Sequence, residues 1–249
     1  MSGHSKWATI KHKKGAADQK RAKVFAKLIR QVEVAAREGG GDPAMNPSLR
    51  TMFQKARDNS VPIDTIERAI KRGTGELEGV QYEQITYEGY APNGVAILID
   101  VLTDNRNRTG GDVRSILKKN GGSIAEPGSV AWQFERKGII TLPRTVEEDD
   151  IMLAALDAGL EDLADEGDTW SLTCAPTDLA AVRAALDEAG IAYDSADSTM
   201  VANMSVTLDT PEAAKAVLRL IDALEDNDDI QDVYSNFDIA DELMQSLEL

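Results

Sequence analysis

Hydrophobic residues near the start of the chain follow the spacing of helices. Over residues 18–37 the apolar positions recur every three or four residues, which predicts one amphipathic helix. Residues 39–43, with three glycines and Pro43, predict its end, because glycine accepts the left-handed cap and proline cannot continue a helix. Asn46 and Pro47 are typical of an N-cap and a first helical residue, so we expect a second helix that ends near Asn59.

A third helix is predicted over residues 65–72. Asp64 and Glu67 have the spacing of a capping box, with aspartate in place of the usual serine or threonine, and Gly73 ends the helix. The second and third helices could also form a helix–turn–helix, although the third has few side chains suited to reading base edges.

Patterns typical of strands appear after residue 80. The turn signature Ala91-Pro92-Asn93-Gly94 separates two of the strands, and Asn120-Gly121-Gly122 ends a helix expected over residues 109–119. The strands expected in this part are 85–90, 95–103 and 129–135.

Residues 138–197 carry a complete split βαβ pattern. The element order is βαββαβ, which is that of the ferredoxin-like fold. The expected strands are 138–142, 160–165, 169–173 and 191–197, and the expected helices are 146–157 and 177–189.

The last β, α and β elements, at 201–208, 211–225 and 230–237, lack a partner nearby. The strand–helix–strand of residues 95–135 would complete them, so we expect the compact unit between to be an insertion. The predicted fold class is α+β and three-lobed: a helical N-terminal domain plus two ferredoxin-like α+β domains, one inserted in the other. The predicted domains are 1–76, 77–136 with 200–240, 137–199 inserted, and a C-terminal tail at 241–249.

Charge is distributed very unevenly along the chain. The net charge is −16, yet residues 1–75 contain sixteen lysines and arginines against seven acids. Residues 1–30 contain nine basic residues and a single acid, Asp18. A basic end on an acidic body indicates a local contact with a polyanion. The alternative is that the acidic surface serves solubility and the basic end balances it.

Several protein classes are disfavoured. No apolar run is long enough to span a membrane, and the start lacks the apolar core of a secretory signal. The single cysteine, Cys174, lies in an apolar run and is expected to be buried, which fits a reducing compartment. We therefore expect a cytoplasmic protein.

Enzymatic chemistry finds little support. The two histidines, His4 and His12, lie in the basic segment, where a metal site or a nucleophilic triad is disfavoured. The acidic runs 147–150 and 226–229 fall at a helix start and at a turn, where we expect solvated carboxylates. We expect no catalytic residues, no metal, no cofactor and no small-molecule substrate.

The first candidate site is the basic N-terminal end. Lysine and arginine neutralise phosphates, and Trp7 could stack on an exposed base, although it could equally pack the segment onto the helices. Nucleic-acid contacts are predicted at Lys6, Trp7, Lys11, His12, Lys13, Lys14, Lys20, Arg21, Lys23, Lys27 and Arg30.

The second candidate site is the segment from Thr103 to Thr109. It joins a strand to a helix, and the N–H groups at a helix start attract anions. Arg106 and Arg108 could grip a phosphate there. In the alternative, Asn107 or Asp104 caps the helix and the arginines pair with nearby acids.

Several of these motifs together resemble a known family. They are Gly3-His4-Ser5-Lys6-Trp7, Ile10 to Lys14, Asp64 to Gly73, Tyr87-Glu88-Gly89-Tyr90, Thr103 to Thr109 and Gly128-Ser129-Val130. Over essentially its full length the chain is similar to the YebC/PmpR family. The resemblance implies a three-domain fold without catalytic residues. It also implies a transcriptional regulator, some bacterial members binding promoter DNA, or a translation factor, since a mitochondrial relative activates translation and bacterial members are linked to stalled ribosomes.

The expected function is therefore a non-enzymatic, nucleic-acid-binding regulator of gene expression. As a DNA-binding transcriptional regulator, the protein would bind phosphates through its basic N-terminal domain. As a ribosome-associated translation factor, the alternative, it would bind ribosomal RNA through the same domain. A third possibility is an acidic scaffold that binds a basic protein partner.

Overall fold

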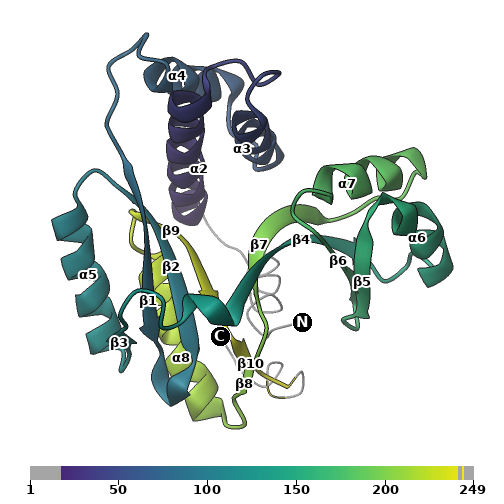
Figure 1. The fold of residues 1–249 in the computed structure, drawn as a ribbon. Coiled ribbons are helices and arrows are strands. Elements are labelled where there is room, and N and C mark those ends of the chain that lie inside the picture. Colours follow the sequence, from purple (N-terminus) through teal and green to yellow (C-terminus); the bar gives the residue numbers. More distant parts are fainter. Residues whose placement is uncertain (1–17, 241–242, 244–249) are drawn as a thin grey trace.

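The computed structural model describes residues 18–240 and Leu243, and for residues 18–21 it describes the backbone alone. Figure 1 shows a helical lobe followed along the chain by two lobes that each combine a sheet with helices. The α+β fold class and the three-lobed shape predicted from the sequence are confirmed.

The helical lobe has one small core of its own. Its three helices are amphipathic, and their apolar stripes face one another. Val32, Leu49 and Ile66, one from each helix, are fully buried there. The helices are α2 (Asp18–Gly39), α3 (Pro47–Asp58) and α4 (Ile63–Gly73).

The two shorter helices begin differently. Asn46 caps α3 as predicted, since its Oδ1 accepts the N–H of Leu49 at 3.0 Å. The capping box predicted for α4 is wrong. That helix begins at Ile63 with Pro62 at the N-cap position and no side-chain cap. Asp64 instead lies in the first turn, where its charge complements the helix dipole.

The middle lobe is built on a four-stranded antiparallel sheet in the order β3-β1-β2-β9. The β1–β2 hairpin is the centre of this sheet, and its turn is a short 3₁₀ segment, η1 (Pro92–Gly94). The strands are β1 (Glu83–Tyr90), β2 (Ala96–Thr103), β3 (Ser123–Ile124) and β9 (Ile230–Ser235).

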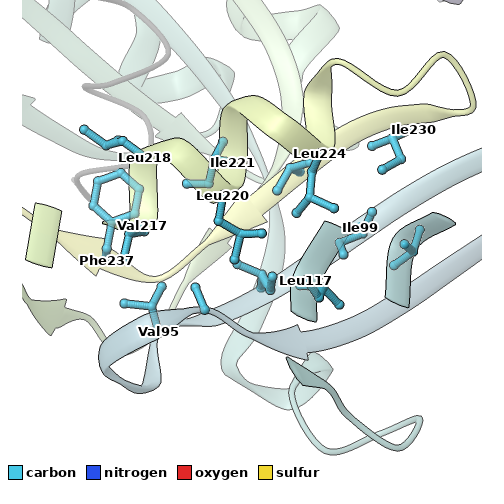
Figure 2. Packing of buried hydrophobic residues seen from close by; sticks show 14 of the residues in the cluster. Val95, Ile99, Leu117, Val217, Leu218, Leu220, Ile221, Leu224, Ile230 and Phe237 are labelled. Atoms are coloured by element: carbon cyan, nitrogen blue, oxygen red, sulfur yellow. The ribbon is translucent and has the colours of Figure 1, made fainter. Parts of the chain in front are cut away.

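Helices α5 (Arg106–Lys119) and α8 (Pro211–Glu225) pack on one face of this sheet. Leu117 of α5 and Leu220 of α8 meet Ile99 of β2 in the largest core of the molecule (Figure 2). The opposite face of β2 is also covered, because Ala96 and Leu98 pack there against Phe134. Burial on both faces explains the continuous apolar sequence of β2.

The third lobe has the βαββαβ order and a sheet in the order β5-β6-β4-β7, so the ferredoxin-like prediction for this unit is confirmed. Cys174 is buried in its core, also as predicted. The elements are β4 (Phe134–Pro143), α6 (Glu148–Ala155) extended by the 3₁₀ turn η3 (Leu156–Ala158), β5 (Leu160–Asp165), β6 (Thr169–Cys174), α7 (Leu179–Glu188) and β7 (Ser195–Ala202).

Two predicted strands are wrong in their bounds. The strand predicted at 129–135 is a turn with the 3₁₀ segment η2 (Ala131–Gln133), and from Phe134 the chain runs on as the single long strand β4. Strand β7 begins four residues later than expected and pairs with β4 from Phe134↔Ala202 to Thr141↔Ser195. Long-range pairing therefore decides both strands, and both ends of the predicted insertion fall inside this paired ribbon.

The middle sheet also differs from the prediction in one member. The expected strand 201–208 does not join it, and its place is taken by β1. Part of that segment forms β8 (Val206–Thr207), which pairs in parallel with β10 (Phe237–Asp238) as a separate two-stranded sheet. The ferredoxin-like order is therefore found in the inserted unit, whereas the middle sheet has a hairpin at its centre.

Candidate nucleic-acid interface

The basic face of α2 lies against an acidic turn of the middle lobe. Lys23, Lys27 and Arg30 are spaced by four and three residues, so they share one helix face. The turn joins α8 to β9 and is defined here as the acidic turn, residues 225–229. Figure 1 shows the N-terminal end of α2 close to the start of β9, which is far from it in sequence.

Each of the three cations donates to oxygens of the acidic turn. Lys23 Nζ donates to Asp226 Oδ1 at 3.0 Å and to the Asp226 carbonyl at 3.1 Å. Lys27 Nζ donates to the carbonyl of Glu225 at 3.0 Å. Burial lowers the pKa of Lys27, and the carboxylates around it offset only part of that effect. These residues already bind anionic and carbonyl oxygens within the protein.

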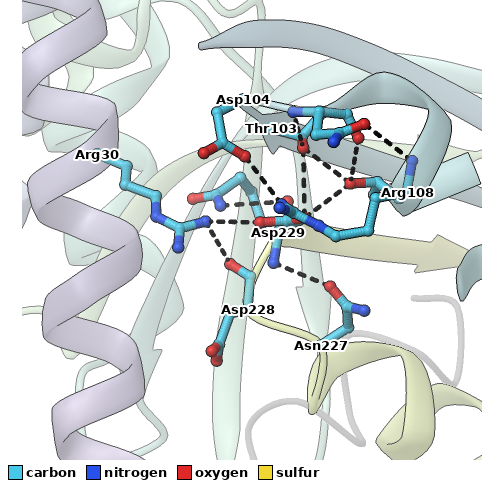
Figure 3. A network of polar contacts seen from close by, with 10 residues as sticks. Arg30, Thr103, Asp104, Arg108, Asn227, Asp228 and Asp229 are labelled. Atoms are coloured by element: carbon cyan, nitrogen blue, oxygen red, sulfur yellow. Dashed lines mark hydrogen bonds and ion pairs between the residues drawn. The ribbon is translucent and has the colours of Figure 1, made fainter. Parts of the chain in front are cut away.

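Arg30 contacts both a carbonyl and a buried carboxylate of the acidic turn. Its NH1 donates to the carbonyl of Asp228 at 2.9 Å and to Asp229 Oδ1 at 3.1 Å (Figure 3). The guanidinium also lies 5.6 Å from the centre of the Tyr82 ring, within the range of a cation–π contact.

Asp229 joins the helical lobe to the start of α5. Its Oδ2 accepts hydrogen bonds from Arg108 NH2 and Thr109 Oγ1, both at 2.7 Å, while Oδ1 faces Arg30. Burial alone would raise the pKa of Asp229. The bonds from Arg108 and Thr109, the charge of Arg108 and the bond from Arg30 outweigh burial and lower it. The solvated carboxylate predicted here is wrong for Asp229, which is 7% exposed, although Asp226 and Asp228 are exposed.

In the second candidate site, only one of the two arginines, Arg108, is involved in these contacts. Helix α5 begins at Arg106, three residues earlier than predicted, and its N-cap is Asn105 rather than Asn107 or Asp104. Arg108 pairs with Asp104 and Asp229, as the alternative interpretation held. Arg106 lies in the exposed first turn, and the structure gives it no ion pair within the described residues.

A second polar contact links the helical lobe to the third lobe. Lys55 of α3 lies 3.4 Å from Asp197 of β7. Burial would lower the pKa of Lys55, but the charges of Asp197 and Asp232 and the hydrogen bond to Asp197 together outweigh burial and raise the pKa. The core of the helical lobe contains only residues of α2, α3, α4 and the turn between them. Within the described residues, ion pairs to the acidic turn and to Asp197 join this lobe to the other two.

Two arginines of the helical lobe form ion pairs within that lobe. Glu33 of α2 is buried and accepts from Arg72 Nε at 2.8 Å and from Arg37 NH2 at 3.2 Å. Arg72, one of the few basic residues of α4, is thereby turned toward α2. Arg68 and Lys71 remain exposed on that helix.

The predicted contacts Lys6, Trp7, Lys11, His12, Lys13 and Lys14 lie outside the described residues. Lys20 and Arg21 fall in the first turn of α2, where the backbone alone is described. Sequence reasoning missed the partner of the α2 face. The signal available was the complementary charge of the run Glu225 to Asp229, which nothing local connects to α2.

Two sequence motifs, Tyr87-Glu88-Gly89-Tyr90 and Gly128-Ser129-Val130, are hydrogen-bonded to each other in the middle lobe. Glu88 of β1 is buried, and its carboxylate accepts three backbone N–H groups, from Gly128, Val130 and Ala131, at 2.6, 2.6 and 2.9 Å. Burial would raise the pKa of Glu88, and these three bonds outweigh it and lower it. Gly128 has a φ of +87°, which disfavours other residues. These motifs have a structural role.

Within residues 18–240, no group of three or more histidine, cysteine, aspartate or glutamate side chains is placed to hold a metal ion. Among the helices of that same part of the chain, none combines the length and apolar character needed to cross a membrane.

Known families and proteins match the chain over its length. The family described as "TACO1/YebC protein N-terminal domain" matches residues 5–76, and that described as "TACO1/YebC second and third domain" matches residues 82–237. A protein named "Probable transcriptional regulatory protein" from Mycobacterium sp. (strain KMS) is 57% identical, with full coverage of both chains. One of the same name from Halothermothrix orenii is 54% identical, with 99% of each covered.

A solved structure has the same fold. The crystal structure of a conserved hypothetical protein from Aquifex aeolicus superposes with a TM-score of 0.81 at 41% sequence identity. The alignment covers 92% of this chain and 95% of the other. The arrangement of three lobes is therefore shared with a protein solved by experiment.

Proposed function

The chain belongs to the TACO1/YebC family, and on that premise we propose that it is a non-enzymatic regulator of gene expression that binds nucleic acid through its basic N-terminal end. Relatives more than half identical over their full length are named "Probable transcriptional regulatory protein", which favours DNA as the partner and regulation over catalysis.

The observation that carries the proposal is the way the α2 cations are used. Lys23, Lys27 and Arg30 form a row in which every member donates to oxygen, including two carboxylates. A phosphate backbone presents anionic oxygens of the same kind. The row continues, in sequence, the basic segment that contains Lys11, Lys13 and Lys14.

The proposal assigns different parts to the two stretches of basic residues. Residues 6–21 provide the first grip on phosphates, because most of the basic residues of the N-terminal end lie there. The α2 row contacts the acidic turn, so a phosphate backbone reaches it only by taking the place of Asp226 and Asp229. Nucleic acid and the acidic turn then compete for the same cations.

A translation factor bound to ribosomal RNA is the second candidate. The basic residues of the N-terminal end favour it in one respect, since lysine predominates over residues 6–21 and lysine binds phosphate as a point charge without selecting a base. Both candidates use the same basic end and differ in the partner.

Crosslinking in cells, followed by sequencing of the attached DNA and RNA, distinguishes the two. Discrete promoter fragments are the expected result for a transcriptional regulator. Crosslinks at one position of ribosomal RNA would instead identify the protein as a translation factor. Recovery of neither nucleic acid above the level of a Lys11→Ala/Lys13→Ala/Lys14→Ala control would overturn the proposal.

A further inference from the structure

The outer side of the third lobe carries a groove between α6 and α7. It has a volume of about 570 Å³ and is lined by Leu153, Ala154, Ala185, Ala189 and Ile191, with Asp150 and Glu188 among its walls. Figure 1 shows these two helices on the same side of the sheet of this lobe, with α6 at its outer end.

Large apolar side chains stand exposed beside this groove. Leu153 is 87% exposed and Leu156, three residues further, is 55% exposed. They are not needed by the core, since Ile151, Ala155 and Leu186 already fill the inner faces of the two helices. Leucines of this exposure beside a groove are typical of a contact surface.

Acidic residues lie at the start of α6 and at the end of α7, and two of them, Asp150 and Glu188, line the groove. They are Glu147, Glu148, Asp149 and Asp150 at the start of α6, and Asp187 and Glu188 at the end of α7. Within the described residues none of these six carboxylates forms an ion pair. The whole unit 137–199 contains three basic residues against fifteen acidic ones.

The acidic residues at the start of α6 and those at the end of α7 have different effects on their helices. Acids at the start of α6 stabilise that helix through its dipole. Acids in the last turn of α7 do the opposite, because the carbonyl end of a helix is partly negative, and no basic residue lies in that turn. Helix stability therefore does not account for Asp187 and Glu188, whereas a bound cationic group does.

We propose that the α6–α7 groove docks a basic amphipathic segment of a partner protein. Apolar side chains of the segment lie on Leu153 and Ile191, and its lysines or arginines face Asp150 and Glu188. The field of fifteen acids excludes a phosphate backbone as the occupant. It also disfavours a second copy of this lobe, because a symmetric contact would place these acids opposite one another. The proposal stands whether or not the N-terminal end binds nucleic acid.

The first test uses a synthetic 18-residue helical peptide with leucine on one face and lysine on the other. A scrambled peptide of the same composition serves as its control, and fluorescence anisotropy measures binding to the full chain. We expect Leu153→Gln to weaken binding about tenfold. Met45→Gln, the same kind of change at another exposed residue, leaves it unchanged. Equal binding of the two peptides, or no effect of Leu153→Gln, would overturn the proposal.

Charge is tested separately by Glu188→Lys, with Asp112→Lys on α5 as the matched exposed control. We expect only Glu188→Lys to abolish the preference for the amphipathic peptide. A photo-crosslinking residue at position 153, used in cells, should then capture a basic protein in a Glu188-dependent manner. Crosslinks to nucleic acid or to a second copy of the chain would contradict the assignment.

Discussion

Arg30 and Asp229 are 199 positions apart in sequence, yet NH1 of the arginine lies 3.1 Å from Oδ1 of the aspartate. The same carboxylate binds Arg108 and Thr109 at the start of α5. One buried side chain thereby connects the helical lobe, the acidic turn and the middle lobe. The position of the basic face of α2 therefore depends on contacts between the helical lobe and the middle lobe.

Replacing Asp229 should destabilise the protein. Asp229→Asn removes charge-assisted hydrogen bonds to two arginines, so we expect the free energy of unfolding to fall by about 1.5–3 kcal/mol. Asp228→Asn is the matched control, because Asp228 is exposed and only its carbonyl binds Arg30. Its effect should stay within about 0.5 kcal/mol. Urea denaturation of both variants measures the difference, and equal losses would contradict the role assigned to Asp229.

The stability difference between wild type and Asp229→Asn should depend on pH. The folded pKa of Asp229 is lowered below the unfolded value of about 3.9. Its contribution is therefore fully present above about pH 5 and is lost as pH falls through the folded pKa. Urea denaturation between pH 3 and pH 7 should show a constant difference that shrinks below about pH 4. A difference that stays constant down to pH 3 would show that Asp229 is not the titrating group.

Glu88→Gln should loosen the segment that contains Gly128 and Val130. The amide loses the negative charge that accepts three backbone N–H groups, so we expect a cost of about 1.5–3 kcal/mol in unfolding free energy. Glu83→Gln, at an exposed position of the same strand, should cost less than about 0.5 kcal/mol. Amide hydrogen exchange should increase at residues 128–131 in Glu88→Gln alone. Unchanged protection there would contradict the role assigned to the Glu88 carboxylate.

Weakening the acidic turn should strengthen nucleic-acid binding. Asp226→Asn removes the exposed ion pair with Lys23, and such pairs contribute about 0.2–1 kcal/mol. If phosphates compete for the α2 row, affinity should rise by about 1.5–5-fold. Asp112→Asn makes the same change of charge on α5 and is the control for the general field of the protein. Equal effects of the two variants would argue against competition.

Much of the fold was accessible from local patterns. Helix α8 has the predicted bounds because Thr210 caps it, Pro211 occupies its first position and its apolar stripe is continuous. The βαββαβ order of the third lobe followed from alternating periodicities in the same way. Arg108 was left between two interpretations because its partner, Asp229, is distant in sequence.

The wrong predictions share a physical origin in long-range contacts. The strand predicted at 138–142 is the second part of the longer strand β4, and a Cβ at Gly138 would lie 2.6 Å from Cys174 Sγ, so close packing with β6 requires glycine there. The middle sheet takes β1 rather than residues 201–208 because part of that segment pairs with β4. No local signal in either segment reports its partner.

The most direct test of the central claim is the salt dependence of nucleic-acid binding by Lys11→Ala/Lys13→Ala/Lys14→Ala. The control is Lys118→Ala/Lys119→Ala/Lys215→Ala, which removes the same charge from exposed sites on α5 and α8. We predict weaker binding and a slope of log K against log salt that is less steep by about 3 for the first variant. The control should keep the wild-type slope. Identical affinity and slope in both variants would contradict the claim that the basic N-terminal end binds phosphates.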